Sequence, residues 1–187
     1  GINTINAAFQ KMAEDYVSEV KAQYAEEAEA EAFYIKDNTL FKAYAFEMNF
    51  EISCNNEKIV SGATAKIANT NGAHPNTVKD GFTYDKASGK EMALTDVMVG
   101  TQAEIQAKVI AEFEKKIDAN TGDFLEGAKD TLQKEIANVE FYMAKDGVHF
   151  FFQLYTIAPY AAGFQEVVFP YADGVTVFVP AAETEAE

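Results

Sequence analysis

The chain has 187 residues, of which 48% are hydrophobic, so its length and composition fit one globular domain with a buried core. Thirty acidic residues oppose 15 basic residues, all of them lysine, and the net charge is −15. Arginine supplies the planar fork that grips phosphate and guanine, so its absence and the acidic charge argue against nucleic acid and anionic membranes as partners.

Membrane and disulfide signals are both absent from the sequence. No apolar run approaches the roughly 18 residues that a membrane helix needs. The chain begins with Gly1 instead of methionine, and we expect any membrane attachment to depend on an anchor upstream of it. The single cysteine, Cys54, allows no internal disulfide and lies in an alternating run, so we expect it to pack rather than react.

The first third of the chain is predicted to form a long helix and an antiparallel hairpin. Residues 2–32 carry apolar side chains at helical spacing, and this stripe consists of Ile5, Phe9, Met12, Tyr16 and Val20. Residues 40–52 and 58–69 alternate apolar and polar side chains on either side of Asn55 and Asn56, which favour a turn. A shift of phase in the first of these strands indicates a β-bulge.

The middle of the chain is predicted to be a loop, a short hairpin and two helices. Asn, Gly and Pro are frequent over residues 69–79, and a short strand at 82–84 is followed by a turn and a return at 91–94. Thr95 and Asp96 can cap a brief helical turn. Thr101 and Glu104 form a capping box ahead of a predicted helix over 102–119. A weaker helical segment is expected over 124–136.

The last third is predicted to be β. Residues 139–143 and 148–154 flank Asp146-Gly147, which is typical of a type I′ hairpin. The run Phe150-Phe151-Phe152 is apolar on both faces and favours a central strand. A loop over 156–163 precedes a strand at 166–169 and an edge strand at 175–179. We therefore predict an α+β fold with one domain over residues 1–180 and a disordered acidic tail over 181–187. An antiparallel β-sheet is expected to carry the long N-terminal helix and a second helix packed on one face.

An ordered series of motifs runs along most of the chain. It consists of Ile5-Asn6, residues 72–76, Tyr84-Asp85 with Thr95-Asp96, Phe141-Tyr142, Asp146-Gly147, Phe150-Phe151-Phe152, Tyr155 and residues 158–163. This order resembles the extracytoplasmic domain of RsiV-type anti-sigma factors, which is also found beside some peptidoglycan deacetylase domains. The resemblance implies a sensor or binding domain at the bacterial cell envelope that is secreted, a lipoprotein or membrane-anchored. In RsiV-like members the domain is a receptor for lysozyme, a strongly basic protein.

Candidate binding residues in the first loop are His74, Pro75 and Asn76. A histidine in such a loop can act as a base, hold a metal ion or hydrogen-bond the loop backbone. We favour the structural role because the other histidine, His149, lies far along the chain without a metal-binding spacing.

Candidate binding residues around the second loop are Tyr155, Pro159, Tyr160 and Phe164. Exposed aromatic side chains at loop tips are frequent binding anchors, whereas tyrosines at the end of a sheet can simply cover its core. The sequence shows no nucleophile elbow, phosphate loop or metal-ligand cluster, so we predict no catalytic residue, no metal site and no cofactor.

These observations favour a non-enzymatic, extracytoplasmic binding or sensor domain of the cell envelope. Its expected partner is a basic protein such as lysozyme, which the net charge of −15 would attract, or a cell-wall glycan. Three alternatives are a cell-wall enzyme that uses His74 and a carboxylate, an accessory module of a polysaccharide deacetylase, and a purely structural module next to another domain.

Overall fold

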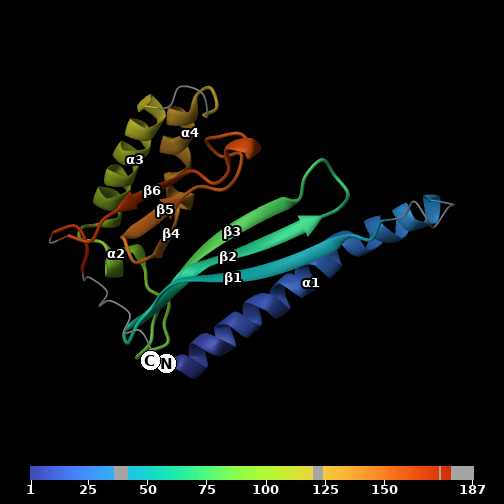
Figure 1. Cartoon of the computed structure of the whole chain (residues 1–187), viewed down its shortest axis with the longest axis horizontal. Coiled ribbons are helices and arrows are strands. Elements are labelled where there is room, and N and C mark those ends of the chain that lie inside the picture. The colour runs from blue at the N-terminus through green and yellow to red at the C-terminus, as the bar shows by residue number, and fades with distance from the viewer. Residues whose placement is uncertain (36–41, 120–123, 173, 178–187) are drawn as a thin grey trace.

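The helices and strands of this chain give an α+β architecture (Figure 1). The computed structural model describes residues 1–35, 42–119, 124–172 and 174–177. The helices are α1 (Ile2–Tyr34), α2 (Leu94–Val97), α3 (Gln102–Ala119) and α4 (Ala128–Glu135), with 3₁₀ turns η1 (Ile136–Asn138) and η2 (Tyr160–Ala162). The strands are β1 (Ala45–Asn55), β2 (Ile59–Asn69), β3 (Asn76–Asp85), β4 (Glu140–Met143), β5 (Val148–Phe151) and β6 (Glu166–Phe169). Among the described residues, no helix combines the length and apolar composition needed to cross a membrane.

The first sheet has the order β1-β2-β3, is antiparallel throughout and has α1 lying along one face (Figure 1). Asn56 shapes the β1–β2 turn, because its side-chain oxygen accepts hydrogen bonds from the backbone N–H groups of Lys58 and Ile59. The ring of Phe9 lies 5.0 Å from that of Phe82 and 5.3 Å from that of Phe50. Such aromatic packing attaches the apolar stripe of α1 to the sheet.

The second sheet has the order β4-β5-β6 and is covered on one face by α3 and α4. Successive side chains of a strand point to opposite faces, so Phe150 faces the core while its neighbour His149 lies on the other face. In that core Phe113 of α3 is fully buried, and its ring lies 5.1 Å from that of Phe152. The buried apolar residues around Phe113 form one cluster, and those between α1 and the first sheet form another. The cluster around Phe113 is the larger and contains most of the buried apolar residues.

The two sheets meet where β4 crosses β2 and β3. The backbone N–H of Met143 donates to Ser61 Oγ at 2.7 Å, and its carbonyl accepts from Ser53 Oγ at 2.7 Å. A Cβ atom on Gly81 would lie 2.0 Å from the carbonyl oxygen of Phe141, so only glycine permits this approach. Hydrogen bonds and close backbone contact therefore join the sheets at one crossing.

The predicted α+β class, the antiparallel strands and the long N-terminal helix are confirmed. The second helix spans Gln102–Ala119 as predicted, and its capping box forms, since Glu104 accepts a hydrogen bond from the backbone of Thr101 at 2.8 Å. The strands divide into two sheets rather than one, and each sheet has its own helices. Strand patterns show which residues face a core but not which strands pair, so this division was not visible in the sequence.

The stretch 69–79 was predicted to be a loop, and this is wrong for its second half. β3 begins at Asn76 and pairs with β2 over its whole length. Its first residues are polar or exposed and therefore lack the alternating pattern of a half-buried strand. The return strand at 91–94 is reduced to a single bridge between Tyr84 and Glu91.

The predicted type I′ turn at Asp146-Gly147 is also wrong. Neither residue has a positive φ, and four residues join β4 to β5, closed by a hydrogen bond from Ala144 N to Gly147 O at 2.9 Å. Gly147 is needed for space instead, because a Cβ there would lie 2.3 Å from the carbonyl oxygen of Phe169.

At the C-terminal end, Thr176 forms only a bridge to Met98 where an edge strand over 175–179 was expected. Residues 178–179 of that strand, the predicted tail over 181–187, the start of the first strand at 40–41 and the helix-ending residues 120–122 lie outside the described residues.

Candidate binding site

Two loops that are distant in sequence meet and bring three aromatic side chains together. His74 lies between β2 and β3, whereas Tyr155 and Tyr160 lie between β5 and β6. The His74 and Tyr160 rings are stacked, with centroids 3.7 Å apart and planes inclined by 15°. His74 Nε2 lies 2.8 Å from the Tyr155 hydroxyl, and the two tyrosine rings lie 5.8 Å apart. We call His74, Tyr155 and Tyr160 the aromatic cluster.

Hydrogen bonds to β3 and the backbone conformation of Tyr155 hold the second loop in place. The side chain of Gln153 pairs with the backbone of Lys79 on β3: its carbonyl accepts from Lys79 N at 3.0 Å, and its amide donates to Lys79 O. Tyr155 follows with a φ of 66°, a left-handed conformation that is rare outside glycine. Pro159 leads into η2, which presents Tyr160. The cluster is therefore held by contacts to the sheet as well as by its own stacking.

The hydrogen bonds of His74 decide which ring nitrogen carries the proton. Nδ1 lies 3.0 Å from the carbonyl oxygen of Pro75, which can only accept, so Nδ1 donates. In the neutral ring Nε2 then accepts from the Tyr155 hydroxyl. Both ring nitrogens of His74 therefore have hydrogen-bond partners. No group of three or more His, Cys, Asp or Glu side chains in the described ranges is arranged to hold a metal ion.

The aromatic cluster is open to solvent. His74 is exposed, Tyr160 is partly exposed, and 56% of Tyr155 is accessible. Large rings fixed in one orientation lose little conformational entropy when they bind, and their hydroxyl groups can still exchange hydrogen bonds. The cluster can therefore act as a preformed contact surface for a protein or a sugar.

Phe164 lies apart from the aromatic cluster, beside a lysine that the sequence analysis did not single out. Lys79 Nζ lies 4.4 Å from the ring centroid of Phe151, 4.7 Å from that of Tyr142 and 5.8 Å from that of Phe164. The same ammonium group lies 3.5 Å from the carboxylate of Glu166. Cation–π and ionic contacts thus fix Lys79 on the face of the second sheet that lies opposite α3 and α4.

Glu166 also belongs to a chain of charges centred on His149. His149 Nδ1 lies 2.6 Å from Glu166 and Nε2 lies 2.7 Å from Asp146, while the Tyr142 hydroxyl donates to Glu166 at 3.0 Å. Burial on its own lowers the pKa of His149, but the hydrogen bonds to Glu166 and Asp146 outweigh it and raise the pKa. We call His149, Asp146 and Glu166 the carboxylate–histidine triad.

The triad holds the ring of His149 through both of its nitrogens. Both ring nitrogens of His149 are bound to carboxylates, so neither is free to take a proton from a substrate. Burial raises the pKa of Glu166, yet the hydrogen bond from His149 and the charge of Lys79 leave it lowered. Side chains alternate between the two faces along β4 and β5, and this alternation puts Tyr142 and His149 on the same face. The sequence pattern could therefore have identified the two residues as neighbours.

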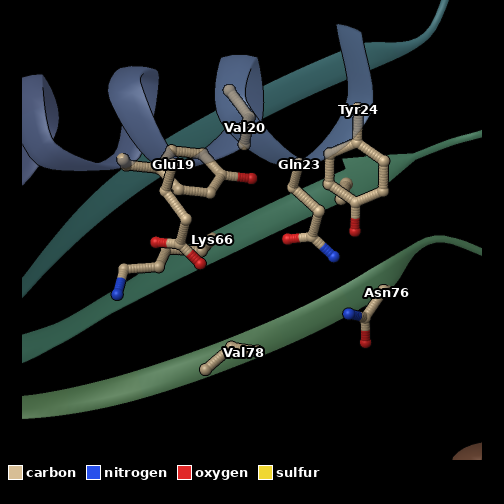
Figure 2. A pocket seen from close by; sticks show the side chains of 9 residues that line it. Glu19, Val20, Gln23, Tyr24, Lys66, Asn76 and Val78 are labelled. Carbon is tan, nitrogen blue, oxygen red and sulfur yellow. The ribbon is translucent and has the colours of Figure 1, made fainter. Parts of the chain in front are cut away.

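Asn76 lies away from the other predicted residues. As the first residue of β3 it lies at the edge of a groove between α1 and the first sheet (Figure 2). The predicted set is thus divided in three: His74, Tyr155 and Tyr160 come together with Pro75 and Pro159 in their loops, Phe164 lies near Lys79, and Asn76 lines the groove.

Two protein-family models match successive parts of this chain. Residues 1–77 match the family described as deacetylase PdaC, and residues 94–172 match DUF3298, a protein family of unknown function. The first match covers α1, β1 and β2, and the second runs from α2 to β6. The PdaC match agrees with the part of the sequence resemblance that concerns deacetylases. No curated protein is significantly similar to the chain in sequence.

Solved structures share this fold at low sequence identity. A DUF3298 family protein from Pseudomonas aeruginosa PAO1 is 22% identical with a TM-score of 0.52, over 71% of this chain and 62% of that protein. A DUF3298 family member from Bacteroides fragilis NCTC 9343 is 17% identical with a TM-score of 0.51, over 89% of this chain and 65% of that protein. The match therefore spans less than two thirds of either protein, and at these identities it concerns the fold alone.

Proposed function

We propose that this chain is a non-enzymatic, extracytoplasmic binding domain of the bacterial cell envelope, and that its partner docks on the aromatic cluster. The observation that carries the proposal is the meeting of His74, Tyr155 and Tyr160, which forms a fixed and exposed aromatic surface. Interface hot spots are rich in such residues. The PdaC match supports placement at the envelope, because the domain that this sequence resembles is found beside peptidoglycan deacetylase domains.

The partner that we propose is a basic protein of the lysozyme type, as in the RsiV-type domains that the sequence resembles. The net charge of −15 supports this choice, because it would speed the approach of a cationic protein. No catalytic residue is assigned, since both nitrogens of His74 and both of His149 already have hydrogen-bond partners.

The experiment is a titration with lysozyme at low and at high ionic strength. Charge steering predicts that the association rate falls steeply once the screening length shrinks below about 8 Å. Tyr160→Ala should weaken binding about thirtyfold, the loss expected for a hot-spot residue. The matched control is Tyr34→Ala, because Tyr34 is 79% exposed at the far end of α1. Absence of binding at low salt would eliminate lysozyme as the partner, and equal effects of the two variants would eliminate this site.

A second function is that of a glycan-binding accessory module in a deacetylase-containing protein. The match of residues 1–77 to the PdaC family favours it. Co-sedimentation with purified peptidoglycan would test it in the same set of variants. The accessory role would be favoured over the sensor role if the wild-type chain sediments with peptidoglycan but does not bind lysozyme, and if Tyr160→Ala abolishes the sedimentation.

A further inference from the structure

β1 forms one edge of the first sheet, and the outer side of this strand is open (Figure 1). Within the ranges that the structure describes, no backbone hydrogen bond joins residues 45–52 to any strand except β2. Alternate residues of an edge strand point their N–H and C=O groups outward, so a row of such groups is available here for pairing. The opposite edge of the sheet is closed, because Glu140 and Gln153 accept hydrogen bonds from the backbone of β3. β1 is therefore the edge of this sheet to which a further strand can be added.

The sequence of this edge lacks the usual obstacles to strand pairing. Proteins commonly protect an open edge with proline, lysine, a bulge or a very short strand. Residues 45–52 contain neither proline nor lysine, β1 is 11 residues long, and its β-bulge comes only after Ile52. The charged residues of the stretch are Glu47 and Glu51, which are both acidic. The edge therefore permits pairing, and its charges are of one sign.

The face of β1 toward α1 offers apolar surface beside the open edge. The ring of Phe50 lies 5.3 Å from that of Phe9, which places Phe50 and, by alternation, Ile52 on this face. Phe50 is 37% exposed and Ile52 is 44% exposed. At the end of β1, Asn55 shares a hollow of about 250 Å³ with Ile2 and Phe9 of α1. An added strand would thus find apolar contacts for the side chains that it directs toward α1.

The other face of β1 is acidic beside the same edge. Glu47 and Glu51 are exposed on it, with Asn49 between them. Neither carboxylate forms an ion pair with another residue in the described parts of the chain. Side chains that an added strand directs to this face would meet two carboxylates, so cationic side chains would be attracted and acidic ones repelled.

We propose that β1 binds an extended peptide segment in which apolar and cationic side chains alternate. The backbone of the segment would extend the sheet, its apolar side chains would contact Phe50 and Ile52, and its cations would pair with Glu47 and Glu51. The inference does not rest on the function proposed for the aromatic cluster, because no residue of β1 belongs to that cluster.

Charge argues against a second copy of this chain as the occupant of the edge. Antiparallel pairing of two β1 strands about Asn49 would set Glu47 of one copy opposite Glu51 of the other, and like charges in such positions are destabilising. Each copy also carries a net charge of −15, which opposes their approach. A basic segment meets neither obstacle.

The probe is a fluorescein-labelled peptide that alternates lysine and valine over about eight residues, the length of the open edge. Fluorescence anisotropy with the full chain should show saturable binding that weakens as salt is added. Hydrogen exchange of the complex should slow in residues 45–52. A peptide of equal length that alternates glutamate and valine should bind at least about tenfold more weakly, because its carboxylates would face Glu47 and Glu51.

Backbone N-methylation of the probe tests strand pairing separately from charge. The N–H groups of the valines point to one edge of the extended peptide and those of the lysines to the other. A peptide methylated at every valine and a peptide methylated at every lysine have the same charge, but only one of them can still donate to β1. We expect their affinities to differ at least about tenfold. Equal affinities would show that charge alone holds the peptide and would overturn the inference.

Glu51→Lys should weaken binding of the lysine–valine peptide about tenfold. The matched control is Glu126→Lys, which makes the same change of charge at an exposed position in the turn before α4. Tyr160→Ala should leave the affinity unchanged. The inference fails if the peptide does not bind, if the two lysine variants behave alike, or if Tyr160→Ala abolishes binding. A dimer in analytical ultracentrifugation that excludes the peptide would assign the edge to a second copy and would also overturn it.

Discussion

At the scale of single residues, the two histidines of this chain have opposite environments. His74 is exposed and bonds to the uncharged oxygens of Pro75 and Tyr155. His149 has only 12% of its side chain exposed and lies between two carboxylates. A histidine held in this way stabilises the fold only while it carries a proton, which makes the carboxylate–histidine triad sensitive to pH.

We expect the stability that His149 contributes to decrease as the pH rises. Its folded pKa is raised above the ordinary value of 6.5, so the contribution is complete below about 6.5 and is lost as the pH passes the folded pKa. His149→Gln should cost about 2 kcal/mol at about pH 6, and this difference from wild type should shrink toward about pH 9. Urea unfolding at several pH values measures it.

The partner Glu166 provides the control for this pH dependence. In a Glu166→Gln background, the effect of His149→Gln should be smaller and should vary less with pH, because one of the two carboxylates is gone. A stability difference between wild type and His149→Gln that stays constant or grows toward alkaline pH would contradict the assignment of a charged His149.

At the scale of elements, the crossing of β3 and β4 decides how the two sheets are arranged. Gly81 allows the backbones to touch, and its N–H donates to the Glu140 carboxylate at 3.1 Å. Burial raises the pKa of that carboxyl group, and the N–H of Gly81 partly offsets the effect. The edge of β3 is thus closed by side chains from the second half of the chain, including Gln153, which protects it from pairing with other molecules.

We predict that Gly81→Ala destabilises the protein by about 3 kcal/mol or more, because the added methyl group would displace the backbone of Phe141. Thermal and urea unfolding of the purified variant would measure the loss. Gly72→Ala is the matched control, since the nearest atom to a Cβ there is 3.8 Å away and its φ lies outside the left-handed region. Similar stabilities for the two variants would show that the sheets can separate at this crossing without cost.

At the scale of the whole molecule, two apolar clusters are joined by polar contacts. The smaller one lies beneath α1, and the larger one lies between the second sheet, α3 and α4 and also takes in Cys54 of β1 and Ile59 of β2. Ser61 is fully buried at the junction, where it hydrogen-bonds to Phe82, Thr83 and Met143. Buried polar groups that would lose their partners on separation couple the two halves energetically.

We expect the two sheets to open as one cooperative unit. Native-state hydrogen exchange should give the central strands β2 and β5 the same free energy of opening, equal to that of global unfolding. Ser61→Ala should lower both values together by about 1–3 kcal/mol, because Met143 N–H loses its buried acceptor. A lower opening free energy for one sheet alone would show that the halves unfold separately.

The sequence by itself determined the local elements of this protein. The span of α3, its capping box and the β1–β2 hairpin follow from hydrophobic period, caps and turn residues, which act over a few neighbouring positions. The second-loop tyrosines and His74 could be identified as candidates for the same reason, since their residue types and loop positions are local properties.

Only the tertiary structure decided how these elements combine. His74 and Tyr155 are separated by 81 positions, and nothing in the pattern of either loop specifies that their rings hydrogen-bond. The split into two sheets, the start of β3 at the polar Asn76 and the enclosure of His149 by carboxylates likewise depend on pairing and burial between distant segments. Short-range sequence patterns indicate which face of a helix or strand is buried. Which other element covers that face depends on contacts between distant segments, and hence on the free energy of the whole chain.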